Sequence, residues 1–285
     1  MKITKQLIVK ELFLRSFEFY KSLNTMKTIY SLLASVLLFW GIIAAVSPKP
    51  TLYIIGDSTV KNGSGKGQDN MWGWGSFLHE HFDTTQIHLE NHAIGGRSSR
   101  TFITEGRWDK ILTDLKPGDF VIMQFGHNDN SAINDSTRAR GTIKGLGEET
   151  EEIDNLLTKK HEIVHSYGWY MRKYVDETKA KGAIPIICSP VPRNSWREGK
   201  IATSEAGHRQ WAEAVAASNG AFYLDLFGLI VPQYEAVGEE KVKNEFFTPK
   251  DNTHTNESGA KLNASSVVKG VKSLKKCSLK QYLKK

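Results

Sequence analysis

The sequence predicts an α/β fold in which helices cover both faces of a parallel sheet. Short apolar runs rich in Val and Ile recur between residues 51 and 224, and longer stretches with helical periodicity separate them. Strands of a parallel sheet are buried on both faces, so they read as continuous apolar runs rather than alternating ones. The chain has no internal repeat and no low-complexity linker, so residues 48–285 are predicted to form a single domain.

Five short runs are expected to be the strands of this sheet. Most of them are rich in apolar residues, and Gly, Asn, Ser or Asp stands at or directly after the carboxyl end of each one. In chain order the expected strands are Leu52–Ile55, Ile87–Asn91, Phe120–Phe125, Ile184–Cys188 and Ala221–Leu224.

Five longer stretches place apolar residues at helical spacing, which predicts amphipathic helices. They are Trp72–Phe82, Arg107–Leu115, Lys160–Lys181, Glu205–Ser218 and Glu257–Leu274. The stretch Asn130–Thr158 has no apolar periodicity and is polar and Gly-containing. Connections of this length in compact domains are usually functional loops or lids, so we expect one here.

Residues 1–47 have the pattern of a secretory signal peptide. A lysine precedes the almost wholly apolar stretch Ile29–Val46, and small residues follow up to Ser47. We expect cleavage after Ser47, export to the periplasm or beyond, and no stable membrane insertion of the mature chain. Met26 is an alternative start, which would make residues 1–25 an extension. The competing interpretation is an uncleaved anchor, since 18 apolar residues reach the spanning length.

Charge and cysteine content exclude several functional classes. The net charge of +7 is uneven: residues 1–47 carry +4, residues 269–285 carry +7, and the body between them carries −4. An acidic body argues against nucleic acid as a partner. Two cysteines are too few for a disulfide scaffold or a Cys-rich zinc module. We expect Cys188 to be a buried free thiol and Cys277 an exposed one; a disulfide between them is the alternative in an exported protein. The sequence leaves the oligomeric state open.

Polar and glycine clusters follow three of the predicted strands, and a fourth opens the last predicted helix. They are Gly56-Asp57-Ser58-Thr59, Gly95-Gly96-Arg97-Ser98, Gly126-His127-Asn128-Asp129 and Asp251-Asn252-Thr253-His254. Ligands of open parallel sheets bind outside the carboxyl ends of the strands. We therefore expect these four clusters to converge at one edge of the sheet.

The converging residues are those that a serine hydrolase needs. Ser58 is a candidate nucleophile on a tight turn, His254 a base, and Asp251 can orient the imidazole from one turn away. The backbone N–H of Gly96 and the side-chain amide of Asn128 are donors for a tetrahedral oxyanion. Taken singly, each cluster has a structural alternative as a helix cap or a turn. All four in this order predict a catalytic site.

With these motifs, the sequence resembles the SGNH hydrolase superfamily, also called the GDSL-like esterases. The matching residues are Gly56-Asp57-Ser58, Gly96, Gly126-x-Asn128-Asp129 and Asp251-x-x-His254, within Thr51–Asn263. The segments GDST, GGRSSRTF, FGHND and DNTHTNESGA are similar to the rhamnogalacturonan acetylesterase branch.

The resemblance implies a three-layer α/β/α sandwich with a five-stranded parallel sheet, of flavodoxin-like type, and no metal or cofactor. It implies Ser58 as nucleophile, His254 as base and Asp251 as the group that orients it. It also implies Ser58, Gly96 and Asn128 as oxyanion donors. The implied activity is deacetylation of pectin-type polysaccharide. The insertion at 130–158 is longer than compact members of the family need.

Arginines and tryptophans near the clusters are candidate substrate contacts. Arg97, Arg100 and Arg193 can pair with uronate carboxylates, since the guanidinium fork matches a carboxylate. Trp74, like Trp72 beside it, can form an aromatic platform for a sugar ring. The alternatives are ordinary surface or capping arginines and core tryptophans.

A rival motif points to a different enzyme class. His161-Glu162-Ile163-Val164-His165 is a literal H-E-x-x-H, which on a helix places two zinc ligands on one face and a general base beside them. Met171 stands where the extended motif has a third His. The alternative is the flank of an amphipathic helix with an apolar stripe that includes Val164 and Met171.

The sequence thus favours a carbohydrate O-acetyl esterase that acts on rhamnogalacturonan-type pectin through an acetyl-enzyme on Ser58. Within the same fold, the alternatives are an esterase for another acetylated polymer such as xylan, or one for a lipid or thioester. A zinc protease using His161 and His165 is an alternative from another class, and a binding module that has lost catalysis is a third. Intact Ser58, Asp251 and His254 argue against the binding module.

Overall fold

The computed structural model describes residue 31 and residues 49–203, 207–249 and 251–285. The predicted signal peptide, residues 1–47, lies outside the described residues apart from Ser31. No helix in the described ranges has both the length and the apolar character needed to cross a membrane.

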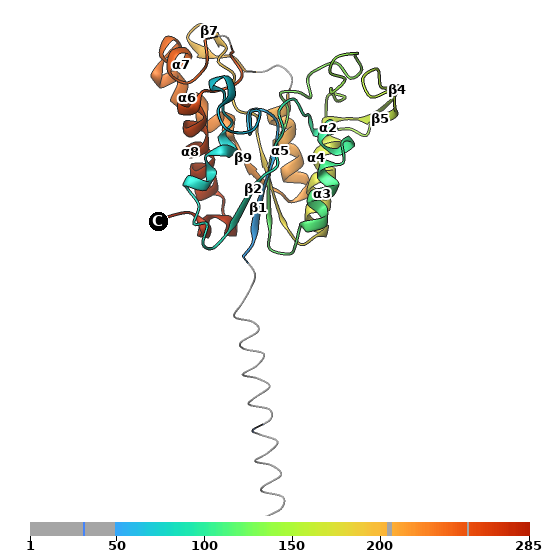
Figure 1. Ribbon diagram of the computed structural model, residues 1–285, viewed down its shortest axis with the longest axis horizontal. Helices are drawn as coiled ribbons and strands as arrows, with labels where there is room; N and C mark the ends of the chain where they lie inside the picture. Colours follow the sequence, from blue (N-terminus) through green and yellow to red (C-terminus); the bar gives the residue numbers. More distant parts are fainter. Residues whose placement is uncertain (1–30, 32–48, 204–206, 250) are drawn as a thin grey trace, which may run out of the picture. The chain divides into compact units, whose positions relative to one another are not determined.

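A five-stranded parallel sheet forms the middle layer, in the order β2-β1-β3-β6-β9 (Figure 1). The strands are β1 Thr51–Gly56, β2 His88–Asn91, β3 Phe120–Gln124, β6 Ile184–Cys188 and β9 Phe222–Leu224. Every residue of β3 is buried, and so is all of β1 after Thr51, because helices cover both faces. The five predicted strands are confirmed, each within one residue at either end.

Two helical layers enclose this sheet, which confirms the three-layer sandwich (Figure 1). Leu52 and Ile54 of β1 face the core under α6 (Leu226–Val237) and α8 (Glu257–Ser273). Tyr53 and Ile55 point the opposite way, as alternate residues of a strand must. The helices on their side are α3 Arg107–Asp114, α4 Tyr167–Ala180 and α5 His208–Asn219.

The remaining elements are α2 Ser99–Thr104, α7 Glu239–Glu245, η1 Gln68–Asn70, η2 Trp74–Ser76, η3 Leu78–Glu80, η4 Ser278–Tyr282, β4 Thr150–Asp154, β5 His161–His165, β7 Trp196–Arg197 and β8 Lys200–Ile201.

The predicted helix Trp72–Phe82 is wrong; only the 3₁₀ turns η2 and η3 form there. The backbone N–H groups of this segment are engaged elsewhere: Trp74 N–H donates to Thr59 O at 3.1 Å and Gly75 N–H to Val60 O at 2.9 Å. These bonds hold the segment against the turn that follows β1. A regular helix would need the same donors for its own carbonyls.

The predicted helix Lys160–Lys181 is wrong in its first third. Residues His161–His165 form β5, which pairs antiparallel with β4. Ser166 then ends the strand and caps α4, since its Oγ accepts a hydrogen bond from Trp169 N–H at 3.1 Å. The insertion therefore continues past residue 158 as a two-stranded hairpin, β4–β5, beside α2 and α4 (Figure 1).

Three other expectations need adjustment. The helix expected from Glu205 begins at His208, and residues 204–206 lie outside the described ranges. Helices α2, α6 and α7 were not expected. Both cysteines are free thiols, as predicted, but the predicted exposure of Cys277 is wrong: it is 1% exposed and packs in the core beneath α8 and η4.

Candidate active site

Ser58 stands in a turn at the carboxyl end of β1 that hydrogen bonds hold tightly. Val60 N–H and Lys61 N–H both donate to Asp57 O at 3.1 Å. The Asp57 carboxylate accepts from the N–H and Oγ of Thr59 at 2.8 and 2.7 Å. Asp57 is fully buried, and burial raises the pKa of its carboxyl group. The turn leaves the Ser58 side chain partly exposed at the sheet edge.

His254 and Asp251 meet this serine from the loop before α8. His254 Nε2 lies 2.8 Å from Ser58 Oγ, and His254 Nδ1 lies 2.6 Å from Asp251 Oδ2. Asp251 Oδ1 also accepts the backbone N–H of His254 at 2.9 Å. Burial alone would raise the pKa of Asp251, but these hydrogen bonds bring it below its ordinary value. An ionised Asp251 only accepts, so Nδ1 carries the proton and Nε2 is left to accept the Ser58 hydroxyl proton.

Two hydrogen bonds between Trp72 and Thr255 fix the position of His254 relative to Ser58. Trp72 N–H donates to Thr255 O at 2.8 Å, and Thr255 Oγ donates to Trp72 O at 3.1 Å. Trp72 follows β1 in the chain, while Thr255 directly follows His254. The two segments that carry the serine and the histidine are thereby joined.

The second and third clusters lie beside Ser58. A Cβ atom placed on Gly95 would come within 3.5 Å of Ser58 Cβ, so this turn packs directly against the serine. Gly96 has φ of +79°, a left-handed conformation that glycine adopts without strain. Asn128 is 6% exposed, and its Nδ2 donates to Arg97 O at 2.9 Å. One hydrogen of that amide fixes the turn, and the other remains for a ligand.

The insertion holds the Gly96 turn through Arg140. Arg140 Nη1 donates to Gly96 O at 3.0 Å, and its Nε donates to Ser131 Oγ at 3.2 Å. Thr142 N–H in the same segment donates to Asp129 O at 3.0 Å. The sequence did not predict this role of Arg140, because no local pattern in the insertion relates it to Gly96.

The predicted substrate contact at Arg100 is wrong. Its side chain is fully buried, with Nε and Nη2 bonded to the two Glu162 oxygens at 2.6 and 2.7 Å. Its Nη1 donates to Ile133 O and Gly141 O, both at 2.8 Å. The N–H groups of the Arg100 guanidinium are therefore directed into the protein. Arg100 therefore anchors the insertion to α2 and has no free edge for a carboxylate of the substrate.

The predicted sugar platform at Trp74 is also wrong. Trp74 is fully buried, and its Nε1 donates to Gln124 Oε1 at 2.9 Å beneath the sheet edge. Arg97 differs from both, because its side chain is one-third exposed and pairs with Glu105 at 3.0 Å. Its contact with substrate stays a prediction.

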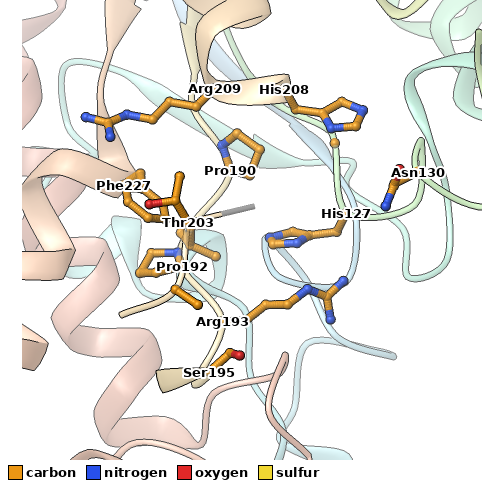
Figure 2. Close-up of a pocket in the computed structure, with 13 residues that line it drawn as sticks. His127, Asn130, Pro190, Pro192, Arg193, Ser195, Thr203, His208, Arg209 and Phe227 are labelled. Carbon is orange, nitrogen blue, oxygen red and sulfur yellow. The ribbon is translucent and has the colours of Figure 1, made fainter. Parts of the chain in front are cut away.

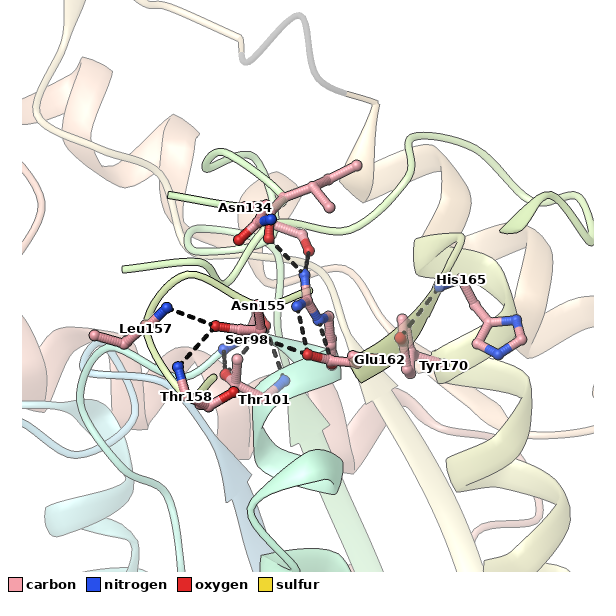
Figure 3. Close-up of polar contacts among 12 residues, drawn as sticks. Ser98, Thr101, Asn134, Asn155, Leu157, Thr158, Glu162, His165 and Tyr170 are labelled. Carbon is pink, nitrogen blue, oxygen red and sulfur yellow. Dashed lines mark hydrogen bonds and ion pairs between the residues drawn. The ribbon is translucent and has the colours of Figure 1, made fainter. Parts of the chain in front are cut away.

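The zinc-protease interpretation is wrong because the H-E-x-x-H residues lie on a strand. His161 and His165 are four residues apart on β5, which separates them by about 13 Å along the strand. Glu162 points to the other face and bonds Arg100 and Asn155 (Figure 3). His165 instead stacks on Trp169 with ring centroids 3.7 Å apart. These residues cannot ligate one ion.

Comparison with known proteins agrees with this geometry. A model of the GDSL-like lipase/acylhydrolase family matches residues 54–262. The rhamnogalacturonan acetylesterase of Emericella nidulans is 32% identical over 221 residues, covering 78% of this chain and 84% of that protein. The probable rhamnogalacturonan acetylesterase YesY of Bacillus subtilis is 31% identical over 226 residues, covering 78% of this chain and 93% of that protein.

The fold is similar to a solved structure as well. The YxiM protein of Bacillus subtilis superposes with a TM-score of 0.63 at 25% identity, covering 79% of this chain and 56% of that one. The chain thus spans little more than half of that structure. With the sheet order, the strand-end residues and these relatives in agreement, the chain belongs to the GDSL-like lipase/acylhydrolase family and is a serine-dependent carboxylic ester hydrolase.

Proposed function

We propose that the protein is a carbohydrate O-acetyl esterase that removes acetyl groups from pectic polysaccharide of the rhamnogalacturonan type. One observation carries the chemistry: the continuous hydrogen-bonded path from Asp251 through His254 to Ser58, with distances of 2.6 and 2.8 Å. The substrate class rests on the two relatives named as rhamnogalacturonan acetylesterases.

The reaction begins when Ser58 Oγ attacks the acetyl carbonyl and its proton passes to His254 Nε2. Asp251 holds the imidazole in the required tautomer and stabilises the imidazolium that forms. The carbonyl oxygen becomes an oxyanion, which the backbone N–H groups of Ser58 and Gly96 and the free amide hydrogen of Asn128 stabilise.

Collapse of this intermediate breaks the bond to the sugar oxygen, which leaves as a hydroxyl after taking the proton from His254. Water then attacks the acetyl-enzyme with His254 again as base, releasing acetate and restoring Ser58. We also propose export through residues 1–47, which would deliver the enzyme to a polymer outside the cytoplasm.

The test compares Ser58→Ala with Ser64→Ala, an exposed serine of the following loop. Acetate release from acetylated rhamnogalacturonan, xylan and galactan is measured side by side, with p-nitrophenyl acetate as the small ester. Ser58→Ala should lower the rate by about 10⁴- to 10⁶-fold, and Ser64→Ala should have no effect. Near-normal turnover by Ser58→Ala would overturn the mechanism. Equal or higher rates on xylan than on rhamnogalacturonan would overturn the substrate class.

A further inference from the structure

A cavity of about 230 Å³ opens at the carboxyl ends of β3 and β6 (Figure 2). Gly126 and His127 follow β3, and Pro190–Arg193 follow β6. Arg193 hydrogen-bonds the side chain of Thr253, the neighbour of His254. Pockets for drug-sized ligands measure about 300–1,000 Å³, so this one has room for a single monosaccharide residue.

His127 supplies the cavity with an unsatisfied acceptor. Its Nε2 is buried and has no hydrogen-bond partner among the described residues. The ring hydrogen-bonds the backbone of Val191, and since Nε2 is unpaired, the donor is Nδ1. Burial, with the nearby charges of Arg193 and His254, lowers the pKa of His127 to about 3, so the ring is neutral. A neutral ring with its proton on Nδ1 leaves a lone pair on Nε2.

Figure 2 shows the His127 ring projecting toward Pro190, Pro192 and Thr203. A buried acceptor without a partner is unfavourable, and a hydroxyl donor from a ligand would supply the missing hydrogen bond. The prolines add apolar walls that suit the C–H face of a sugar ring. The cavity thus combines the His127 acceptor with apolar walls and with the polar side chains of Asn130, Ser195 and Thr203.

The charge at the cavity comes from Arg193. Two arginines line it, but Arg209 is engaged by Asp225 through Nε at 2.9 Å and Nη2 at 2.5 Å. Arg193 bonds only the uncharged Thr253 side chain, and no carboxylate in the described ranges pairs with it. The guanidinium therefore keeps donors for an anion, and a planar carboxylate matches their geometry.

We propose that this cavity is a subsite for one hexuronate residue of the polysaccharide, whose hydroxyl donates to His127 Nε2 and whose carboxylate pairs with Arg193. The proposal rests on the proposed function, since it makes this residue a neighbour of the acetylated sugar. It assigns to Arg193 the preference for an anionic chain and to His127 the binding of a sugar hydroxyl.

The test is a binding measurement in the Ser58→Ala background, where no turnover interferes. D-galacturonate and D-galactose are titrated into the full chain by calorimetry, because the two sugars differ only by the carboxylate at C6. Galacturonate should bind about tenfold more tightly, as one charge-assisted hydrogen-bonded pair predicts. Arg193→Gln should abolish this difference and leave galactose binding near its starting value. The control is Arg197→Gln, which removes an exposed arginine of the nearby β7 without effect on either sugar.

His127 is tested by two variants that separate its acceptor from its volume. His127→Phe should weaken both sugars about tenfold, because the hydroxyl loses its acceptor whatever the charge. His127→Gln, which supplies an amide oxygen, should restore part of the affinity, and melting curves establish that each variant is folded. Equal binding of the two sugars, no binding of either, or affinities unchanged in Arg193→Gln would overturn the subsite. Full esterase activity in Ser58→Ala would instead overturn the catalytic proposal, whatever the binding result.

Discussion

Replacing Arg100 by Ala should destabilise the protein without acting on substrate binding. The change removes the partner of Glu162 and also leaves Ile133 O and Gly141 O without their donor. Breaking a buried pair costs about 3–5 kcal/mol. The Glu162 side chain is 15% exposed, so water can partly reach it, and we expect about 3 kcal/mol, at the lower end of that range.

This free energy corresponds to a fall in Tm of roughly 6–12 °C, since 1 kcal/mol shifts the Tm of a domain of this size by about 2–4 °C. The matched control is Arg97→Ala, which breaks a pair one-third exposed on both sides. Exposed pairs contribute about 0–1 kcal/mol, so its Tm should stay within about 4 °C of the wild type. Thermal unfolding followed by circular dichroism at pH 7 measures both.

The pH dependence gives a second check on the same pair. Burial would raise the pKa of Glu162, but hydrogen bonds from Arg100 and Asn155 lower it below its ordinary value of 4.5. The stabilisation is therefore complete above pH 4.5 and is lost as the pH falls through the lower folded pKa. The Tm difference between wild type and Arg100→Ala should shrink in that acidic range. If Arg100→Ala melted within 2 °C of wild type at pH 7 and lost activity only on the polymer, the anchoring role would be refuted.

Three further predictions concern the groups around the serine. Asn128→Ala should lower kcat by roughly 10²- to 10³-fold with little change in KM, because its amide acts on charge present only in the transition state; a rise in KM alone would contradict this. Burial raises the pKa of Asp129 to about 7, so its folded form keeps a proton that the unfolded chain releases near pH 4. The free energy of unfolding should therefore decline from about pH 4 to 7, and urea titrations of Asp129→Asn should show a flatter profile; parallel profiles would argue against it. Arg140→Ala should reduce kcat on p-nitrophenyl acetate about tenfold by loosening the Gly96 turn, as loss of a charged hydrogen bond predicts. Arg138→Ala, an exposed neighbour, should not, and equal effects would remove the role of Arg140.

The central sheet could be predicted because the apolar residues that bury each central strand are adjacent in the sequence. The central strands β1, β3 and β6 are almost wholly buried, so an unbroken apolar run marks each of them regardless of which strand lies beside it. The edge strand β2 has no buried residue, and exposed and half-buried residues alternate along it instead. The convergence of the clusters at Ser58, Gly96 and Asn128 was predictable for a related reason: each follows a strand, and parallel strands bring their carboxyl ends to one edge. His254 follows no strand, and its place beside Ser58, 196 residues away, was predicted from the residue types that a serine hydrolase needs.

The missed helices and hairpin have weak or misleading patterns. α6 is apolar on most of its surface and carries Pro232, so residues 226–237 show no clear amphipathic period. β4 has a single buried residue, Ile153, and therefore lacks the alternation that marks a half-buried strand. In residues 160–181, Ile163 and Val164 fit a helical stripe by spacing, yet β5 exposes the first and buries the second.

Arg100 and Trp74 were misassigned because their burial depends on partners that lie far away in the sequence. Whether Arg100 is a surface cation depends on Glu162, which lies 62 positions along the chain. Likewise, Trp74 finds its partner Gln124 50 positions away, and nothing near either residue signals the pairing. Burial of a polar side chain is decided by a long-range partner, so local patterns cannot forecast it.

The insertion hydrogen-bonds the turns beside the proposed catalytic residues, whereas a lid would only cover bound substrate. A lid is open in the empty enzyme and closes over bound substrate. Here Arg140 holds Gly96 O and Thr142 N–H holds Asp129 O, so the insertion already restrains both turns that carry the proposed oxyanion donors Gly96 and Asn128. Arg100 and Glu162 lock it in that position. Changes that loosen the insertion should therefore slow small esters and polymers alike, because the geometry they disturb is the one that every acetyl group meets.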